Sequence, residues 1–126
     1  MNPISLPHDH GQHSQQLTRQ MPGDDVFSSV ADAFKMLSDG KRMQIYWLLC
    51  HCEECVINIS AMVSMSSPAV SHHLKLLKNA GLITSRREGK EVYYTAVKSG
   101  QAAQLHSAIE KLIAIRCPLE AEHAHE

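Results

Sequence analysis

The chain has 126 residues, of which 44% are hydrophobic, and its 12 Lys and Arg residues nearly balance its 13 Asp and Glu residues. This length is enough for one modest core, and no apolar run approaches the roughly 18 residues of a membrane span. The N-terminus is polar and rich in His, unlike a signal peptide. We therefore expect a cytoplasmic protein without a membrane partner, whose four cysteines serve metal or redox chemistry rather than structural disulfides.

The small net charge of −1 hides an uneven distribution. Residues 66–98 hold six Lys and Arg side chains against two Glu, whereas residues 1–34 hold four Asp against a single Arg. A basic segment of this kind suits a surface that faces phosphates. Charge alone does not distinguish such a surface from an ordinary solvated face.

Three segments are expected along the chain. Residues 1–23 are predicted to form a flexible arm that contains histidines, because Pro and Gly interrupt a stretch of Gln, Ser and His. Residues 24–117 are predicted to form the folded domain, and residues 118–126 a polar tail that also contains His. The sequence has no internal repeat.

Three helices are predicted in the first half of the folded domain. The first begins at Asp24 and carries apolar residues at helical spacing that would face a core or a partner, namely Val26, Val30, Phe34 and Leu37. The second and third are predicted at 41–50 and 56–63, with a polar junction at 51–55 between them. Their expected core-facing residues are Ile45, Leu48, Leu49, Ile59, Met62 and Val63.

A fourth helix is predicted to start at Ser67, a residue type that caps helices, with Pro68 at its first helical position. It is expected to end near Gly81, because Gly readily takes the left-handed conformation that follows a helix. Its apolar residues Val70, Leu74 and Leu77 are four and then three positions apart, which places them on one helix face that is expected to enter the core.

Two strands are predicted at 82–87 and 91–97, joined by a turn that contains Gly89. A last helix follows at about 101–115, and Pro118 ends it. Its apolar stripe consists of Leu105, Ala108, Ile109, Leu112 and Ile115. This order of elements predicts a mainly helical fold with a small β-hairpin: a winged helix-turn-helix of four helices, two strands and a final helix.

The fourth helix and the hairpin are predicted to bind DNA. Small hydroxyl side chains near a helix N-terminus allow close approach to a groove, and basic side chains at the hairpin tip would reach phosphates. The residues expected to contact DNA are Ser66, Ser67, Ser71, His72, Lys75, Arg86, Arg87 and Lys90. His73 lies closer to the buried side and is expected to be a packing residue. The alternative is a plain solvent-exposed helix surface, which the basic hairpin argues against.

Two segments, AVSHHLKLLKNAGLI at 69–83 and REGKEVYY at 87–94, resemble the ArsR/SmtB family of bacterial winged-helix repressors. The resemblance extends over about residues 26–115. It implies a homodimer built from the first and last helices, bound to double-stranded operator DNA of two-fold symmetry. It also implies a repressor of efflux or resistance genes that an inducer releases from DNA.

Members of this family sense inducers at different sites, so the resemblance has to be followed residue by residue. At the start of the third helix, relatives carry Cys-Val-Cys, where this chain has Cys55 and then Val56 and Ile57. The second family cysteine is therefore missing. However, Cys52 lies three residues before Cys55, which is the spacing of a two-thiolate metal site.

A second family site, on the last helix, lacks its ligands here, because its positions hold Lys98, Gly100, Lys111 and Ala114. This departure favours a thiolate-bound soft or borderline metal: cadmium, lead, zinc or arsenite. The expected ligands are Cys52, Cys55 and Cys117, with Cys50, His8, His10 and His13 as further candidates. Cys50 follows two leucines and has the alternative of being a buried hydrophobic residue.

Three other interpretations stay open. A thiol redox or persulfide sensor on the same fold would pair Cys117 with another cysteine and need no metal. A constitutive DNA-binding or partner-binding module would have no inducer. A small zinc enzyme would use the His and Cys side chains, but the sequence has no H-E-x-x-H motif and little room for a substrate pocket, so we expect no enzymatic activity.

Overall fold

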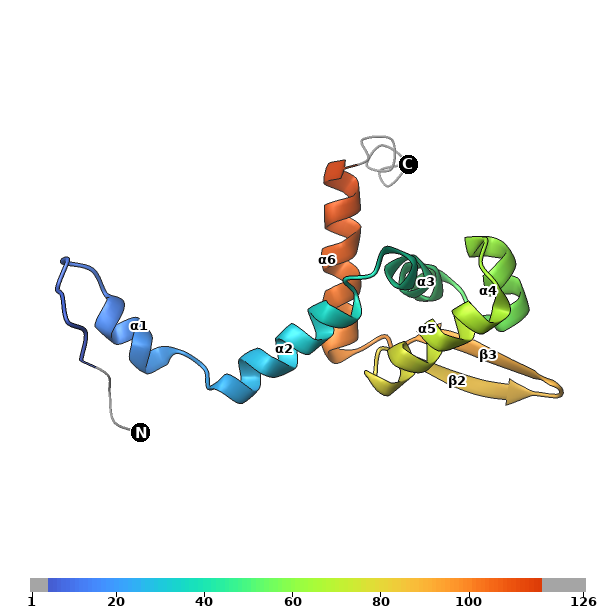
Figure 1. Ribbon diagram of the computed structural model, residues 1–126, viewed down its shortest axis with the longest axis horizontal. Helices are drawn as coiled ribbons and strands as arrows, with labels where there is room; N and C mark the ends of the chain where they lie inside the picture. Colours follow the sequence, from blue (N-terminus) through green and yellow to red (C-terminus); the bar gives the residue numbers. More distant parts are fainter. Residues whose placement is uncertain (1–4, 117–126) are drawn as a thin grey trace. The chain divides into compact units, whose positions relative to one another are not determined.

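The structure is a computed structural model that describes residues 5–116 (Figure 1). Its elements, in chain order, are α1 (Ser14–Gln20), α2 (Asp24–Met36), α3 (Gly40–His51), β1 (Glu54–Cys55), α4 (Val56–Val63), α5 (Ser67–Asn79), β2 (Ile83–Glu88), β3 (Glu91–Ala96) and α6 (Gly100–Arg116). The chain divides into two compact units between residues 34 and 35. The predicted segment boundaries at residues 23 and 117 stay predictions. No helix within residues 5–116 is long and apolar enough to cross a membrane.

The N-terminal unit contains a helix that the sequence pattern did not predict. α1 forms within the predicted arm, although it has no side-chain cap and no acidic residue in its first turn. The hydroxyl of Thr18 donates a hydrogen bond to the carbonyl oxygen of Ser14 at 3.0 Å, one turn earlier. None of its residues is buried.

The start of α2 agrees with the sequence, since Asp24 and Asp25 occupy its first turn. Most of the predicted apolar stripe is exposed, however. Val26, Val30 and Phe34 are all exposed, and Phe34 keeps 62% of its surface accessible. Only Leu37, which belongs to the second unit, is buried.

The core of the second unit is built around α3, which packs against α4, α5, α6 and β3. Most of the predicted core is confirmed, because the buried residues include Ile45, Leu49, Ile59, Val63, Val70, Leu74 and Leu77. Met62 was expected in the core and is exposed, so that assignment is wrong, and Leu48 is only half-buried. The short α4 needs only two apolar positions, Ile59 and Val63, to close its inner face.

The N-cap of α5 lies one residue earlier than predicted. The side chain of Ser66, not Ser67, caps the helix by accepting a hydrogen bond from the backbone N–H of Ala69 at 3.3 Å. Ser67 is then the first helical residue and Pro68 the second, where a missing N–H is still harmless. After the helix, Gly81 adopts φ +76°, as the sequence predicted.

The sheet has three strands in the order β1-β3-β2, and all neighbours are antiparallel. β1 was not predicted: it consists of two residues, and it pairs Cys55 with Tyr93 of β3. The hairpin of β2 and β3 closes where Glu88 pairs with Glu91, and Gly89 takes φ +63° in the two-residue turn. In Figure 1 this hairpin projects from the helices of the second unit.

Candidate functional site

The exposed face of α5 carries the polar residues that the sequence assigned to DNA. The buried side chains of Val70, Leu74 and Leu77 fix the rotation of the helix against the core. The opposite face is therefore turned outward, and its exposed residues are Ser66, Ser67, Ser71, His72 and Lys75. The hydroxyl of Ser67 also lies 3.2 Å from the hydroxyl of Ser60. This contact joins the first turn of α5 to α4.

His73 is a packing residue, as predicted. Its Nδ1 lies 3.3 Å from the guanidinium nitrogen Nη1 of Arg42, on α3. Burial lowers the pKa of His73 below its usual value, so the ring is neutral at neutral pH and its Nδ1 can accept this hydrogen bond. His73 therefore joins α5 to α3 and does not face solvent as His72 does.

Arg86 on β2 is already held by two carboxylates. Its Nη2 lies 2.6 Å from Glu53, in the loop after α3, and its Nη1 lies 2.6 Å from Glu88. The guanidinium also lies over the ring of Tyr93, at 4.9 Å from the centroid. Hydrogen bonds to Glu53 and then Glu88 raise the pKa of Arg86 and neutralise its charge locally.

Arg87 and Lys90 differ from Arg86. Both are exposed at the end of the hairpin, and neither forms an ion pair with any residue in the described range 5–116. Lys78, near the end of α5, donates a hydrogen bond to the hydroxyl of Ser85 on β2 at 2.7 Å. The hairpin thus keeps Arg87 and Lys90 available for a ligand. The hydrogen bond from Lys78 to Ser85 joins the hairpin to α5.

The cysteines of the α3–α4 junction differ in accessibility. Cys50 is only 7% exposed, and burial raises the pKa of its thiol. It therefore behaves as a core residue, which was the alternative that the sequence offered. Cys52 is half-buried, its Sγ donates to the carbonyl oxygen of Leu48 at 3.4 Å, and burial raises the pKa of this thiol too.

Cys55 lies where β1 meets α4, at the N-cap position of that helix. It is half-buried. Cys117 lies outside the described residues. Within residues 5–116, the only group of three ligand atoms drawn from His, Cys, Asp and Glu that lie within 4.8 Å of one another contains no cysteine.

The arm histidines are exposed. The rings of His8 and His10 stack with their centroids 5.8 Å apart, while His13 lies at the N-cap position of α1. All three belong to the N-terminal unit and the described cysteines to the second.

The structure also brings together His51, His106 and Glu110, a group that the sequence did not predict. The available signal was weak: His106 and Glu110 stand four residues apart on α6 and so share a face. Their partner His51 is 59 residues from Glu110 in the chain, and only the packing of α3 against α6 shows that they meet.

Comparison with known proteins places this arrangement in a family. The model of the bacterial regulatory proteins of the arsR family matches residues 39–85, from the cap of α3 into β2. The cadmium resistance transcriptional regulatory protein CadC homolog of Staphylococcus aureus is 43% identical over 82 residues, which cover 64% of each chain. The HTH-type transcriptional regulator KmtR of Mycobacterium tuberculosis is 32% identical over 101 residues, which cover 80% of this chain and 71% of that protein. The first CadC relatives are matched over 56% to 64% of their own length.

A solved structure shares both fold and sequence with this chain. The homodimeric winged helix-turn-helix DNA-binding domain of a possible ArsR-family transcriptional regulator from Mycobacterium bovis is 30% identical. It superimposes with a TM-score of 0.63, covering 77% of this chain and 93% of that one. Family and fold are those of transcriptional regulators and not of enzymes. From its winged helix-turn-helix fold and these matches, the chain belongs to the arsR family of bacterial regulatory proteins.

Proposed function

We propose that this chain is a homodimeric, sequence-specific DNA-binding repressor that leaves its operator when a metal ion binds its cysteine thiolates. The observation that carries the DNA-binding part is the pair of faces on α5. One face is fixed in the core, and the other presents hydroxyl, imidazole and ammonium groups to solvent. A helix of this kind, followed by a basic hairpin, suits a major groove and its flanking phosphates.

The residues proposed to serve DNA binding differ in their roles. Ser66, Ser67 and Ser71 lie in the first turns of α5, where their hydroxyl groups are proposed to bond base edges or phosphates, and where the positive end of the helix dipole also favours phosphate. His72 and Lys75 extend further along the same face and are proposed to reach base edges. Arg87 and Lys90 are proposed to contact phosphates. Arg86 is proposed to act indirectly, because its pairing with Glu53 holds the hairpin against the loop after α3.

The dimer is proposed to form through apolar residues that the single chain leaves exposed. On α2 these are Val26, Val30 and Phe34, and on α6 they are Leu112 and Ile115. Large exposed apolar side chains that cluster on helices are typical of an association surface. The Mycobacterium bovis relative is homodimeric, and a two-fold dimer would bind an operator with two matching half-sites.

Metal sensing is proposed at Cys52, Cys55 and Cys117, with the arm histidines as additional candidates. Thiolates favour cadmium, lead, zinc or arsenite, and one relative is a homolog of a cadmium resistance regulator. Cys55 belongs to β1, which pairs with β3 of the hairpin, and it also starts α4. An ion at Cys55 would therefore act where the hairpin and the helix-turn-helix meet. It can release DNA only by binding the DNA-free conformation more tightly.

Metal binding should strengthen as pH rises. Burial raises the pKa of Cys52, so its thiol is protonated at neutral pH. A metal ion must displace this proton, and higher pH lowers the cost of doing so. Apparent cadmium affinity, measured between pH 6 and pH 8, should increase over this range, and proton release should be detectable in weak buffer.

The proposal is tested with full-length, fully reduced protein and an operator selected from random DNA. Cadmium should produce an ultraviolet sulfur-to-metal charge-transfer band, and the anisotropy of labelled operator should fall at the same stoichiometry. Cys55→Ser should abolish the band and the release while metal-free DNA binding persists. Cys50→Ser, a matched change at a buried cysteine, should have much less effect. Deleting residues 1–20 should weaken cadmium binding if the arm histidines are ligands.

A different outcome of the same experiment would reject the metal switch. No thiolate band and no DNA release in reduced protein, with release on mild oxidation or persulfide treatment, would reject the metal switch. That outcome would assign the same cysteines to a thiol redox or persulfide sensor on this fold.

A further inference from the structure

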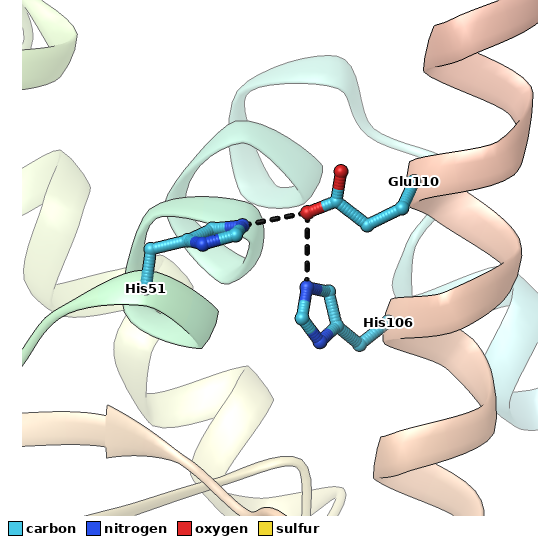
Figure 2. A group of neighbouring side chains, drawn as sticks. All are labelled: His51, His106 and Glu110. Atoms are coloured by element: carbon cyan, nitrogen blue, oxygen red, sulfur yellow. Dashed lines mark hydrogen bonds and ion pairs between the residues drawn. The ribbon is translucent and has the colours of Figure 1, made fainter. Parts of the chain in front are cut away.

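We infer that His51, His106 and Glu110 form a second metal site, joining α3 to α6 and taking a borderline divalent ion of the zinc class. Figure 2 shows the three side chains pointing toward one another, His51 from the end of α3 and the other two from one face of α6. Their ligand atoms all lie within 4.8 Å of one another. This inference does not depend on the thiolate switch.

The two imidazoles converge on one carboxylate oxygen. Oε1 of Glu110 lies 2.6 Å from Nε2 of His51 and 3.0 Å from Nε2 of His106. The two rings meet edge to face, with their centroids 5.1 Å apart. Both nitrogens therefore face the same oxygen, and three donor atoms from three different side chains already lie together.

This donor set suits zinc. Two His and one Glu, with a fourth position left for water, form a known type of zinc site. Ligand atoms about 2.1 Å from a tetrahedral ion are roughly 3.4 Å apart, so the two nitrogens need only move outward by less than about 1 Å from the carboxylate oxygen. The side chains of His51, His106 and Glu110 are 44%, 32% and 40% exposed, which gives an ion access and leaves the rings room to move.

The site is separate from the proposed thiolate site and from the last-helix site of the family. Its donors are nitrogen and oxygen, whereas the proposed inducer site uses sulfur. It also differs from the last-helix site of the resembled family, whose positions hold Lys98, Gly100, Lys111 and Ala114. Because α3 packs against α5 as well as α6, an ion here would connect the DNA-reading helix to the helix with exposed Leu112 and Ile115.

Trp47 supplies a direct reporter of occupancy. It is the only tryptophan in the chain, and its ring centroid lies 4.5 Å from that of His51. A paramagnetic ion held by His51 would lie close to this indole and quench its fluorescence. An ion bound at the arm or at the thiolates would not have His51 as a ligand. Quenching of Trp47 that is lost in a His51 variant therefore identifies binding at this site.

The test uses full-length protein carrying Cys52→Ser, Cys55→Ser and Cys117→Ser, so that the proposed thiolate site is removed. Titration with Co²⁺ should quench Trp47 emission at one ion per chain and give visible absorption of a low-coordinate cobalt site. Added Zn²⁺ should restore the emission by displacement. His51→Gln and Glu110→Gln should each weaken cobalt binding at least tenfold and remove the quenching.

Matched controls separate the site from general His and Glu effects. His73→Gln and Glu91→Gln make the same chemical changes elsewhere, and both should bind cobalt like the parent, as should a chain without residues 1–20. Circular dichroism verifies that each variant is folded. Unchanged cobalt affinity and quenching in His51→Gln and Glu110→Gln would overturn the inference, as would absence of quenching in the parent at millimolar cobalt. The group would then be a hydrogen-bonded pair of histidines that joins two helices. Neither result bears on the ultraviolet thiolate band, so the two metal proposals fail independently.

Discussion

Arg86 and Arg87 are neighbours in the sequence, yet their side chains have different surroundings. Arg86 contacts Glu53 and Glu88 at 2.6 Å and covers the ring of Tyr93. Arg87 has no ion-pair partner within residues 5–116. A paired guanidinium contributes less to a phosphate-binding potential than a free one, because a carboxylate beside it cancels its field.

Replacing Glu53 by Gln should therefore strengthen non-specific DNA binding. The change removes one negative charge next to Arg86 and leaves its guanidinium with Glu88 alone. Affinity for random duplex DNA should rise, and the salt dependence should become steeper by up to about one counterion. Asp32→Asn makes the same change in net charge on α2 and should have little effect on the slope. A Glu53→Gln slope equal to that of the parent would show that Arg86 does not reach DNA even when released.

Substitutions on α5 and on the hairpin should have different effects. Ser71→Ala or His72→Ala should lower operator affinity and relax discrimination at particular base pairs, because each good base contact contributes about 1–3 kcal/mol. Arg87→Ala and Lys90→Ala should weaken all sequences alike and reduce the salt slope, because phosphate contacts carry no sequence information. Operator binding and specificity can be measured by titrating mismatched operators. Normal discrimination by folded Ser71→Ala and His72→Ala proteins would contradict the assigned face.

Residue-level prediction from the sequence works where the cause is local. The outward face of α5 follows from the spacing of Val70, Leu74 and Leu77, and the structure confirms that these three are buried. The pairing of Arg86 with Glu53 spans 33 residues and depends on how the hairpin returns to α3. No pattern within either segment contains that information.

At the scale of elements, boundaries depend on caps that the sequence places to within a residue. Ser66 and Ser67 are equally good capping residues by type, and the choice between them depends on backbone geometry: Ser66 is extended and accepts from Ala69. β1 escaped prediction because two residues have no periodicity, and its existence depends on pairing with β3. The hairpin turn was predictable because Gly89 marks it directly.

Gly81 ends α5 in a conformation that other residues adopt only with strain. At φ +76°, alanine should cost about 1–2 kcal/mol of folding free energy, although no atom within 4 Å would contact the added Cβ. Thermal or urea unfolding of Gly81→Ala should show this loss. Gly40→Ala provides the control, since Gly40 has no positive φ and open space around it; there alanine should stabilise by about 0.4–1 kcal/mol. Equal effects of both substitutions would show that the left-handed cap is not required.

For the whole molecule, the fold of the second unit follows from its sequence, while the surroundings of α2 do not. Helical spacing predicted an apolar stripe on α2 for a core or a partner, and the described chain leaves Val26, Val30 and Phe34 exposed. Leu105 and Ile109 of α6 are buried, yet Leu112 and Ile115 of the same stripe are exposed. A single chain therefore satisfies only part of its apolar pattern, and a second copy is the occupant that we propose for the rest.

Leu112→Glu tests this assembly. Leu112 is 62% exposed in the single chain, so a carboxylate there should cost the monomer little. In the proposed dimer the same carboxylate would be buried without a partner, at a cost of several kcal/mol. Sedimentation should then show a folded monomer, and operator affinity should fall because two half-sites are no longer bound together. Ser107→Glu adds the same charge to another exposed position of α6 and should remain dimeric. A stable, folded Leu112→Glu dimer would move the interface away from this part of α6.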